Sequence, residues 1–329
     1  MTDEPAIDRE VQPVDADRAI YESMSRRTRR SFLAGGAALA VAAAGFELFN
    51  RGKPIGLLRR PLRAAEDFNG LVSEYVIGET RLAPTYPAES AIINPRTNGP
   101  FGMRDDLDLG SWRLQLSGLA SPQTHPAYID DVTSWKYSYL RSAKADGPEG
   151  KIAQPPSNMV GDNNKLSGAG SVMSSEPQLP SPLPSAPGVL LTMNDVQKMP
   201  FVEQTTEFKC IEGWSEITRF GGVRFRDFIA MYPPFRNRDG SLPRYAAMTS
   251  IDGAYFCGFE MASLMHPQTL LCFQMSGRDL TPGHGAPLRL AMPLKYGYKQ
   301  IKQIARISYT NTKPEDYWAS LGFDWHGGL

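Results

Sequence analysis

A stretch of 47 residues in the middle of the chain is unable to form part of a packed core. Residues 142–188 contain eight prolines, eight serines and six glycines, and they contain no aromatic residue. Ordering such a segment costs ~1–2 kcal/mol per residue, which its few apolar side chains cannot offset. The preceding stretch, residues 47–141, has few strand signals of its own. We therefore expect 142–188 to be a surface insertion in one domain, and not a linker between two domains.

The rest of the chain alternates short apolar runs with turn residues. It holds 30 glycines and 27 prolines, a share that favours strands, turns and loops over helical bundles. The pattern indicates an α+β fold in which strands dominate. Short helices are predicted at residues 193–198, 225–231 and 260–265, and strands at residues 112–117, 208–211, 245–250, 288–292 and 305–309.

The composition excludes several classes of protein. The 329 residues include 35 basic and 35 acidic side chains, so we expect neither a nucleic-acid partner nor a polybasic membrane patch. Three cysteines are too few for a disulfide scaffold, and a chain of this length does not need one. No Cys-x-x-Cys or His-x-x-x-His spacing is present, so a structural zinc site is not predicted.

The first 46 residues have the pattern of an export signal. Arg29 and Arg30 are followed by Ser31-Phe32-Leu33, which fits a twin-arginine signal, a route that carries folded proteins. Residues 31–46 are uncharged, rich in alanine and glycine, and short for a membrane span. We expect residues 1–46 to be a cleaved signal or an uncleaved anchor. The protein is then periplasmic, and in the second case it is tethered to the inner membrane.

A helical lead-in is predicted between this signal and the folded domain, at residues 47–80. Apolar residues from Leu62 to Tyr75 recur at helical spacing, which indicates one amphipathic helix whose apolar face packs against other elements. The domain itself is expected to span residues 81–329.

Cys210 is the residue of the chain that most clearly suggests a chemical function. It lies in Phe208-Lys209-Cys210-Ile211-Glu212-Gly213-Trp214-Ser215, where a predicted strand ends before a glycine-bearing turn. A thiol held there by a rigid element faces a loop-lined cavity, where a metal ligand or a nucleophile is useful. A buried structural cysteine is an equally good interpretation of the same pattern. Cys257 and Cys272 lie in apolar runs, and we expect both to belong to the core.

Basic side chains gather with glycines near the C-terminus. His284 and Arg289 lie in Pro-Gly-His-Gly-Ala-Pro-Leu-Arg, and Lys295 and Lys299 flank Tyr-Gly-Tyr. Glycine lets backbone N–H groups approach a phosphate, while arginine and lysine supply charge. In a neutral protein this cluster suggests a bound anionic cofactor, although an exposed basic loop would have the same sequence. Two further segments, residues 94–99 and 249–255, are rich in turn residues and add side chains that donate hydrogen bonds.

Together these four segments resemble the molybdenum-cofactor domain of the sulfite oxidase family, and in particular its exported bacterial branch, which includes periplasmic protein-methionine-sulfoxide reductases. The resemblance runs from about Arg81 to Leu329. Cys-x-Glu-x-Trp-Ser at 210–215 is the family's molybdenum-ligand motif, and His-Gly-x-Pro-x-Arg at 284–289 with Gly-Tyr-Lys at 297–299 matches its pterin-phosphate segment. His284 stands where the reductases have asparagine, as in the sulfite oxidases.

The resemblance implies a fold, a cofactor and a set of site residues. The fold is the strand-dominated α+β type that binds molybdopterin. Cys210 would be the protein ligand to one molybdenum per chain, held by molybdopterin, with no haem. Glu212 and Trp214 would line the catalytic pocket beside it. The residues implied to bind the pterin or its phosphate are Arg96, Asn98, Cys210, Ser250, His284, Arg289, Gly297, Tyr298 and Lys299.

The implied reaction is oxygen-atom transfer to or from a small or protein-bound sulfur substrate, because the cofactor supplies that chemistry and the protein positions it. A haem-containing electron-transfer partner, membrane-bound or soluble, is also implied. Two alternatives stay open. One is a thiol hydrolase that uses Cys210 with His266 or His284, which leaves the basic cluster and the export signal unexplained. The other is an exported binding module without catalysis.

Overall fold

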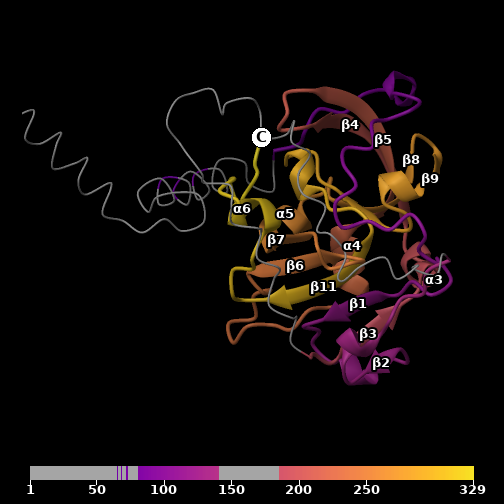
Figure 1. Cartoon of the computed structure of the whole chain (residues 1–329). Helices are drawn as coiled ribbons and strands as arrows, with labels where there is room; N and C mark the ends of the chain where they lie inside the picture. The colour runs from indigo at the N-terminus through magenta and orange to yellow at the C-terminus, as the bar shows by residue number, and fades with distance from the viewer. Residues whose placement is uncertain (1–64, 66–67, 69–71, 73–80, 141–184) are drawn as a thin grey trace, which may run out of the picture. The chain divides into compact units, whose positions relative to one another are not determined.

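The computed structural model describes residues 65, 68 and 72, 81–140 and 185–329 (Figure 1). All of them belong to one unit, Ala64–Leu329. The predicted export signal and most of the predicted insertion lie outside the described residues. Among the residues that are described, we find no helix with the length and apolarity that a membrane span requires.

Six strands form the larger sheet, in the spatial order β2-β3-β1-β11-β6-β7 (Figure 1). β1 and β11 pair in parallel, with Gln115 opposite Arg306 and Ser117 opposite Ser308, whereas the other neighbours pair antiparallel. A parallel pair needs a long crossover, and here the smaller sheet lies in the sequence between the two strands. The strands are β1 (Leu114–Ser117), β2 (Tyr128–Ile129), β3 (Gly188–Leu191), β6 (Tyr245–Ser250), β7 (Phe256–Glu260) and β11 (Ile304–Thr310).

The smaller sheet has the order β10-β8-β5-β4, with β9 paired to β8. Its strands are β4 (Phe201–Lys209), β5 (Ser215–Arg224), β8 (Leu270–Met275), β9 (Arg278–Asp279) and β10 (Arg289–Ala291). β4 and β5 form a long antiparallel hairpin that is in register from Phe201 opposite Val223 to Lys209 opposite Ser215. The turn of this hairpin carries Cys210.

The helices are short and are fixed by side-chain caps or by packing. α3 (Met193–Gln197) begins with a capping box between Thr192 and Asp195. α4 (Phe225–Met231) and α5 (Met261–Met265) contribute buried apolar residues to one large core with the inner face of the six-stranded sheet. α6 (Tyr317–Ser320) is capped by Asp316. Single 3-10 turns occur at Ala88–Ser90, Pro122–Thr124, Val132–Ser134, Pro282–His284 and Gly297–Lys299.

The fold class predicted from the sequence is confirmed, with specific errors. The helices expected at 193–198, 225–231 and 260–265 are α3, α4 and α5. The strand expected at 208–211 is wrong in its limits, because β4 ends at Lys209 and Cys210 lies in the turn. β7 was not predicted because all five of its residues are buried. A strand buried on both faces shows no alternation of apolar and polar residues.

The predicted insertion extends too far along the chain. Gly188, its last residue, is the first residue of β3. A Cβ atom there would lie 2.1 Å from the Leu116 carbonyl oxygen, so this close strand pair requires glycine. The Ala186 carbonyl accepts a hydrogen bond from the Val132 N–H at 3.0 Å. The C-terminal boundary of the insertion therefore lies before Ala186.

The apolar face of the predicted lead-in helix is exposed where it is described. Ala65, Phe68 and Val72 are helical, as the spacing predicts. Phe68 and Val72 are nevertheless 65% and 42% exposed, so these side chains do not pack as we expected.

Candidate active site

Cys210 is held at the end of the β4–β5 hairpin. Its N–H donates to the Trp214 carbonyl at 2.9 Å, and the Gly213 N–H donates to the Cys210 carbonyl at 3.1 Å. Gly213 adopts a left-handed φ of 90°, which glycine tolerates without strain. The hairpin therefore fixes the backbone of Cys210 and directs a residue that is 6% exposed into a cavity.

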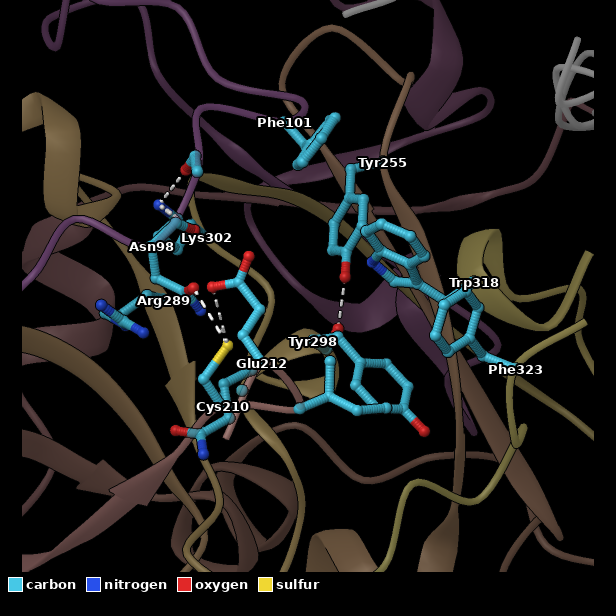
Figure 2. Close-up of a pocket in the computed structure, with 14 residues that line it drawn as sticks. Asn98, Phe101, Cys210, Glu212, Tyr255, Arg289, Tyr298, Lys302, Trp318 and Phe323 are labelled. Carbon is cyan, nitrogen blue, oxygen red and sulfur yellow. Dashed lines mark hydrogen bonds between the residues drawn. The ribbon is translucent and has the colours of Figure 1, made fainter. Parts of the chain in front are cut away.

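This cavity, of about 170 Å³, has a polar side and an aromatic side (Figure 2). Both sides combine residues that are distant in sequence. The polar side is formed by Asn98, Cys210, Glu212, Arg289 and Lys302, and the aromatic side by Phe101, Tyr255, Tyr298, Trp318 and Phe323.

The Cys210 thiol has two polar neighbours, neither of which is a histidine. Its sulfur lies 3.5 Å from the Asn98 amide oxygen and 3.6 Å from a Glu212 carboxylate oxygen. The same Glu212 oxygen accepts a hydrogen bond of 3.0 Å from the Trp214 indole. Burial raises the pKa of the Cys210 thiol, and the Glu212 carboxylate adds to the increase. A positive charge brought close to the sulfur is needed to favour the thiolate.

Arg289 is buried with part of its hydrogen-bonding capacity unused. It is 3% exposed, and its Nη1 donates to the His284 carbonyl at 3.2 Å. Its Nε is buried and has no hydrogen-bond partner. Its guanidinium lies 5.2 Å from the Phe220 ring centroid. Burial lowers the pKa of Arg289 to about 10, so the guanidinium stays charged at neutral pH.

Lys302 is a charged cavity residue that the sequence did not single out, and the same holds for the uncharged Phe101, Gln300 and Phe323. Its ammonium group donates to the carbonyls of Thr97 and Gly99, at 2.5 Å each, and to the Gly283 carbonyl at 3.3 Å. All of these acceptors are neutral. Burial, followed by repulsion from Arg289, lowers the pKa of Lys302 to about 7. An anion in the cavity would oppose both effects, because a nearby negative charge raises the pKa of the amine.

Lys299, predicted to bind the pterin phosphate, lies outside this cavity. Its ammonium group is fully buried and donates to Asp316 Oδ2 at 2.5 Å, to the Gly258 carbonyl at 2.6 Å and to the Trp325 carbonyl at 2.7 Å. Asp316 neutralises the charge of this amine, whereas the acceptors of Lys302 are all neutral. Lys299 therefore anchors the C-terminal segment on β7 and is not available to a ligand.

Ser250, also predicted to bind the pterin or its phosphate, has a structural role. Its hydroxyl donates to Asp252 at 2.9 Å and accepts the Tyr255 N–H at 3.1 Å. Ser250 thus shapes the turn that delivers Tyr255 to the cavity, and it does not line the cavity itself.

Gly297 and Tyr298, predicted to bind the cofactor, line the cavity. A Cβ atom on Gly297 would lie 2.4 Å from the Phe208 ring, so this position requires glycine. The Tyr298 carbonyl accepts a hydrogen bond from the Tyr255 hydroxyl (Figure 2). These contacts join the Gly-Tyr-Lys turn to the aromatic side.

Arg96 and His284 border the site without lining it. The Arg96 guanidinium lies 4.8 Å from the Trp214 ring centroid. The His284 ring is held between the Thr281 hydroxyl, at 2.8 Å, and the Pro95 carbonyl, at 3.0 Å. Glu212 lines the cavity. Trp214 does not line it, and its indole N–H donates to the Glu212 carboxylate.

His266 does not support the hydrolase alternative. Its Nε2 contacts the Arg81 carbonyl at 3.0 Å, and its Nδ1 accepts the Gln268 N–H at 3.2 Å. Neither His266 nor His284 lines the cavity of Cys210. In the described residues, Cys210 therefore has no general base of the kind that a thiol hydrolase requires.

Comparison with known proteins identifies one domain of the chain. Residues 185–318 match the family described as "Oxidoreductase molybdopterin binding domain". This match contains Cys210, Arg289 and Lys302. Residues 185–318 are a molybdopterin-binding oxidoreductase domain.

Relatives of this oxidoreductase differ in how much of it they cover. The Azospira oryzae protein that carries the name protein-methionine-sulfoxide reductase subunit YedZ1 is 27% identical over 81% of this chain and 76% of its own. The catalytic subunit MsrP of Campylobacter jejuni protein-methionine-sulfoxide reductase is 35% identical over 40% of this chain and 48% of its own. The sulfane dehydrogenase SoxCD of Paracoccus pantotrophus aligns over 40% of this chain and 36% of its own, with 19% identity and a TM-score of 0.35.

The donor set of the oxidoreductase cavity fits an anionic metal cofactor. The described residues contain no group of three or more His, Cys, Asp or Glu side chains that could hold a metal by themselves. A metal at Cys210 therefore needs ligands from a second molecule, which a dithiolene supplies. The buried Nε of Arg289 and the carbonyl-bound amine of Lys302 fit the negative charge of a phosphate.

Proposed function

We propose that this enzyme transfers an oxygen atom at a sulfur centre, with one molybdenum per chain bound by molybdopterin and by Cys210. The observation that carries the proposal is the shared cavity of Cys210, Arg289 and Lys302. A soft ligand and two buried cations without a carboxylate partner suit a metal cofactor that ends in a phosphate. When bound, the cofactor supplies the two-electron oxygen-transfer chemistry.

The polar side of the cavity holds the cofactor in this proposal. Arg289 binds its anionic part, and the carbonyl-bound amine of Lys302 adds positive charge beside it. Asn98 orients the Cys210 sulfur through the contact of 3.5 Å. Burial raises the pKa of the Cys210 thiol, and a metal bound there would favour the thiolate. Glu212, held by the Trp214 indole, is the ionisable group next to the sulfur and limits how the cofactor approaches it.

The aromatic side receives the substrate. Trp318 contacts both Phe101 and Phe323, with ring centroids 5.9 Å apart for Phe101–Trp318 and 5.1 Å apart for Trp318–Phe323. Such a surface excludes water and suits an apolar organic sulfur group, because sulfur contacts aromatic rings favourably. Two relatives bear names of protein-methionine-sulfoxide reductases. We therefore favour a protein-bound or small sulfoxide as the substrate.

The reaction in this direction converts a sulfoxide to a thioether. The S–O bond breaks, and the oxygen leaves as water after the uptake of two protons and two electrons. The electrons come from a haem-containing electron-transfer protein, either membrane-bound or soluble, because we assign no haem to this chain. Twin-arginine export of the loaded enzyme to the periplasm completes the proposal, with residues 1–46 as signal or anchor, 47–80 as lead-in and 81–329 as the catalytic domain.

The test is the composition and activity of purified full-length protein. We expect molybdenum and pterin near one per chain, and reduction of methionine sulfoxide with an artificial electron donor. Sulfite oxidation under the same conditions checks the opposite direction of transfer. Protein that is folded and active without molybdenum would refute the proposal, and hydrolase activity in such protein would revive the thiol mechanism.

A further inference from the structure

Buried cations in this structure divide into two groups. Two of those in the described residues form ion pairs within 4 Å, Lys295 with Glu260 and Lys299 with Asp316. The others have no carboxylate within that distance in the described part of the chain. The buried lysine and arginine side chains are Arg289, Lys295, Lys299, Lys302 and Arg306.

Of the three without a carboxylate, two line the active-site cavity and are explained by an anionic cofactor. Arg306 is the third, and it lines a different cavity. A buried charge without a counter-ion is costly, so its presence at Arg306 needs an explanation of its own.

Within the described part of the chain, one edge of the Arg306 guanidinium has no hydrogen-bond partner. Arg306 is 5% exposed and lies in β11 opposite Gln115. Its Nε and Nη2 both donate to the Gln115 amide oxygen, at 3.2 and 3.0 Å. A guanidinium has five N–H donors, so three remain, and two of these lie parallel on the end edge between Nη1 and Nη2. This is the edge that carboxylates and other oxyanions bind with two hydrogen bonds.

The described lining of the second cavity supplies further donors and no negative charge, and the Asp131 carboxylate acts on Arg306 from outside this lining. The volume of the cavity is about 430 Å³, and its described lining includes Arg306, Ser117 and Ser308, with Arg306 as the single charged residue. Arg306 and Ser308 are two residues apart in β11, so their side chains share a face and lie roughly 7 Å apart. The hydroxyls of Ser117 and Ser308 are 2.7 Å apart. Since one hydrogen bond between them uses one proton, the pair has a second proton to donate.

We propose that this cavity is a binding site for a small oxyanion, held by the end edge of Arg306 and by the hydroxyl pair of Ser117 and Ser308. The ligand class is a carboxylate or a tetrahedral sulfur or phosphorus oxyanion. Lys302 precedes Arg306 by four residues, which span at most ~13 Å. The site is nevertheless separate from the cofactor cavity, because the two cavities share no described lining residue. A loaded cofactor therefore leaves the Arg306 site available.

The test measures anion binding to the full-length, cofactor-loaded enzyme. Sulfate is titrated against chloride at constant ionic strength by equilibrium dialysis, with acetate and phosphate as competitors. We expect one saturable sulfate site in the wild type. Arg306→Gln removes the positive charge and the two parallel N–H donors of the end edge. We expect it to weaken binding by about tenfold or more, as the loss of a charge-assisted contact predicts. The stronger competitor distinguishes a carboxylate ligand from a tetrahedral one.

Matched variants keep the outcome clear. Ser308→Ala preserves the charge and should weaken binding several-fold, which tests the site even if Arg306→Gln fails to fold. Arg278→Gln, at an exposed arginine of β9, removes the same charge elsewhere and should leave binding unchanged. Absence of a saturable site in the wild type, or equal binding by the wild type, Ser308→Ala and Arg306→Gln, would overturn the proposal.

Discussion

The Cys210 sulfur lies 3.5 Å from the Asn98 amide oxygen, although 112 residues separate the two positions. Two segments that each have the sequence of an ordinary turn thus form one wall of a cavity. The buried Arg289 and Lys302 lie in the same cavity, which supports the proposed role of the thiol as a cofactor ligand.

Replacement of this thiol is the most direct check on the site. We expect Cys210→Ser to abolish turnover and to alter the electron paramagnetic resonance spectrum of the metal, because a hydroxyl is a harder ligand that rarely ionises at neutral pH. Pterin should largely remain, since Arg289 and Lys302 hold its phosphate. Metal content, spectrum and turnover with an artificial donor are the measurements.

The controls are Cys257→Ser and Cys272→Ser. Both thiols are fully enclosed, next to the carbonyls of Tyr298 and Leu270. Each change should cost ~1–3 kcal/mol of stability and spare the activity of the folded fraction. Normal turnover by Cys210→Ser would remove the central support of the molybdenum assignment.

Two lysines three residues apart should behave in opposite ways. Lys302→Met removes the cavity cation and is expected to lower pterin and molybdenum content while the fold survives. Lys299→Met leaves Asp316 as a buried carboxylate without its partner, and should reduce the free energy of unfolding by about 3–5 kcal/mol. Cofactor content and urea unfolding of both variants check the pair.

Adding Asp316→Asn to Lys299→Met serves as the control, because it removes the buried charge and should restore part of the lost stability. If Lys299→Met folds normally but loses cofactor, the assignment of the two lysines is reversed.

The stability of the cofactor-free protein should depend on pH through Lys302. Its pKa in the folded chain is about 7, against a reference value of 10.5. Between these values the unfolded lysine keeps a proton that the folded one has released, so the Lys302 contribution to stability rises with pH over this window. Below pH 7 the cost of burying the charged amine is present in full.

Cofactor binding should show the opposite trend, since a phosphate favours the protonated amine and affinity should fall as pH rises above about 7. Unfolding and reconstitution of the cofactor-free wild type and Lys302→Met, at about pH 6.5 and about pH 9, test both trends. Identical pH dependence in the two proteins would exclude Lys302 as the titrating group.

Export should depend on the paired arginines. Arg29→Lys combined with Arg30→Lys is expected to leave a folded precursor in the cytoplasm, because both charges are kept while the pair that defines the signal is lost. The amount of protein in the periplasmic fraction is the measurement, with Arg26→Lys as the control. Unchanged periplasmic yield of the double variant would contradict twin-arginine export.

The local sequence determined the elements whose pattern is short-range. The Cys210 turn follows from a strand, a glycine with left-handed φ and a second strand, all within a few residues. α4 follows from apolar spacing, and strand dominance follows from the frequency of glycine and proline. In these cases neighbouring residues are enough to specify the backbone.

Only the tertiary structure decided which basic residues enter the cavity. Lys299 and Lys302 have similar sequence surroundings. The Lys299 amine, however, donates to Asp316 and to the carbonyls of Gly258 and Trp325. Lys302 instead contacts carbonyls about 200 residues earlier in the chain. The role of a buried lysine depends on the acceptors that surround it after folding. Those acceptors come from distant strands and loops. The side-chain charge is therefore encoded locally, whereas its partner is fixed by long-range packing.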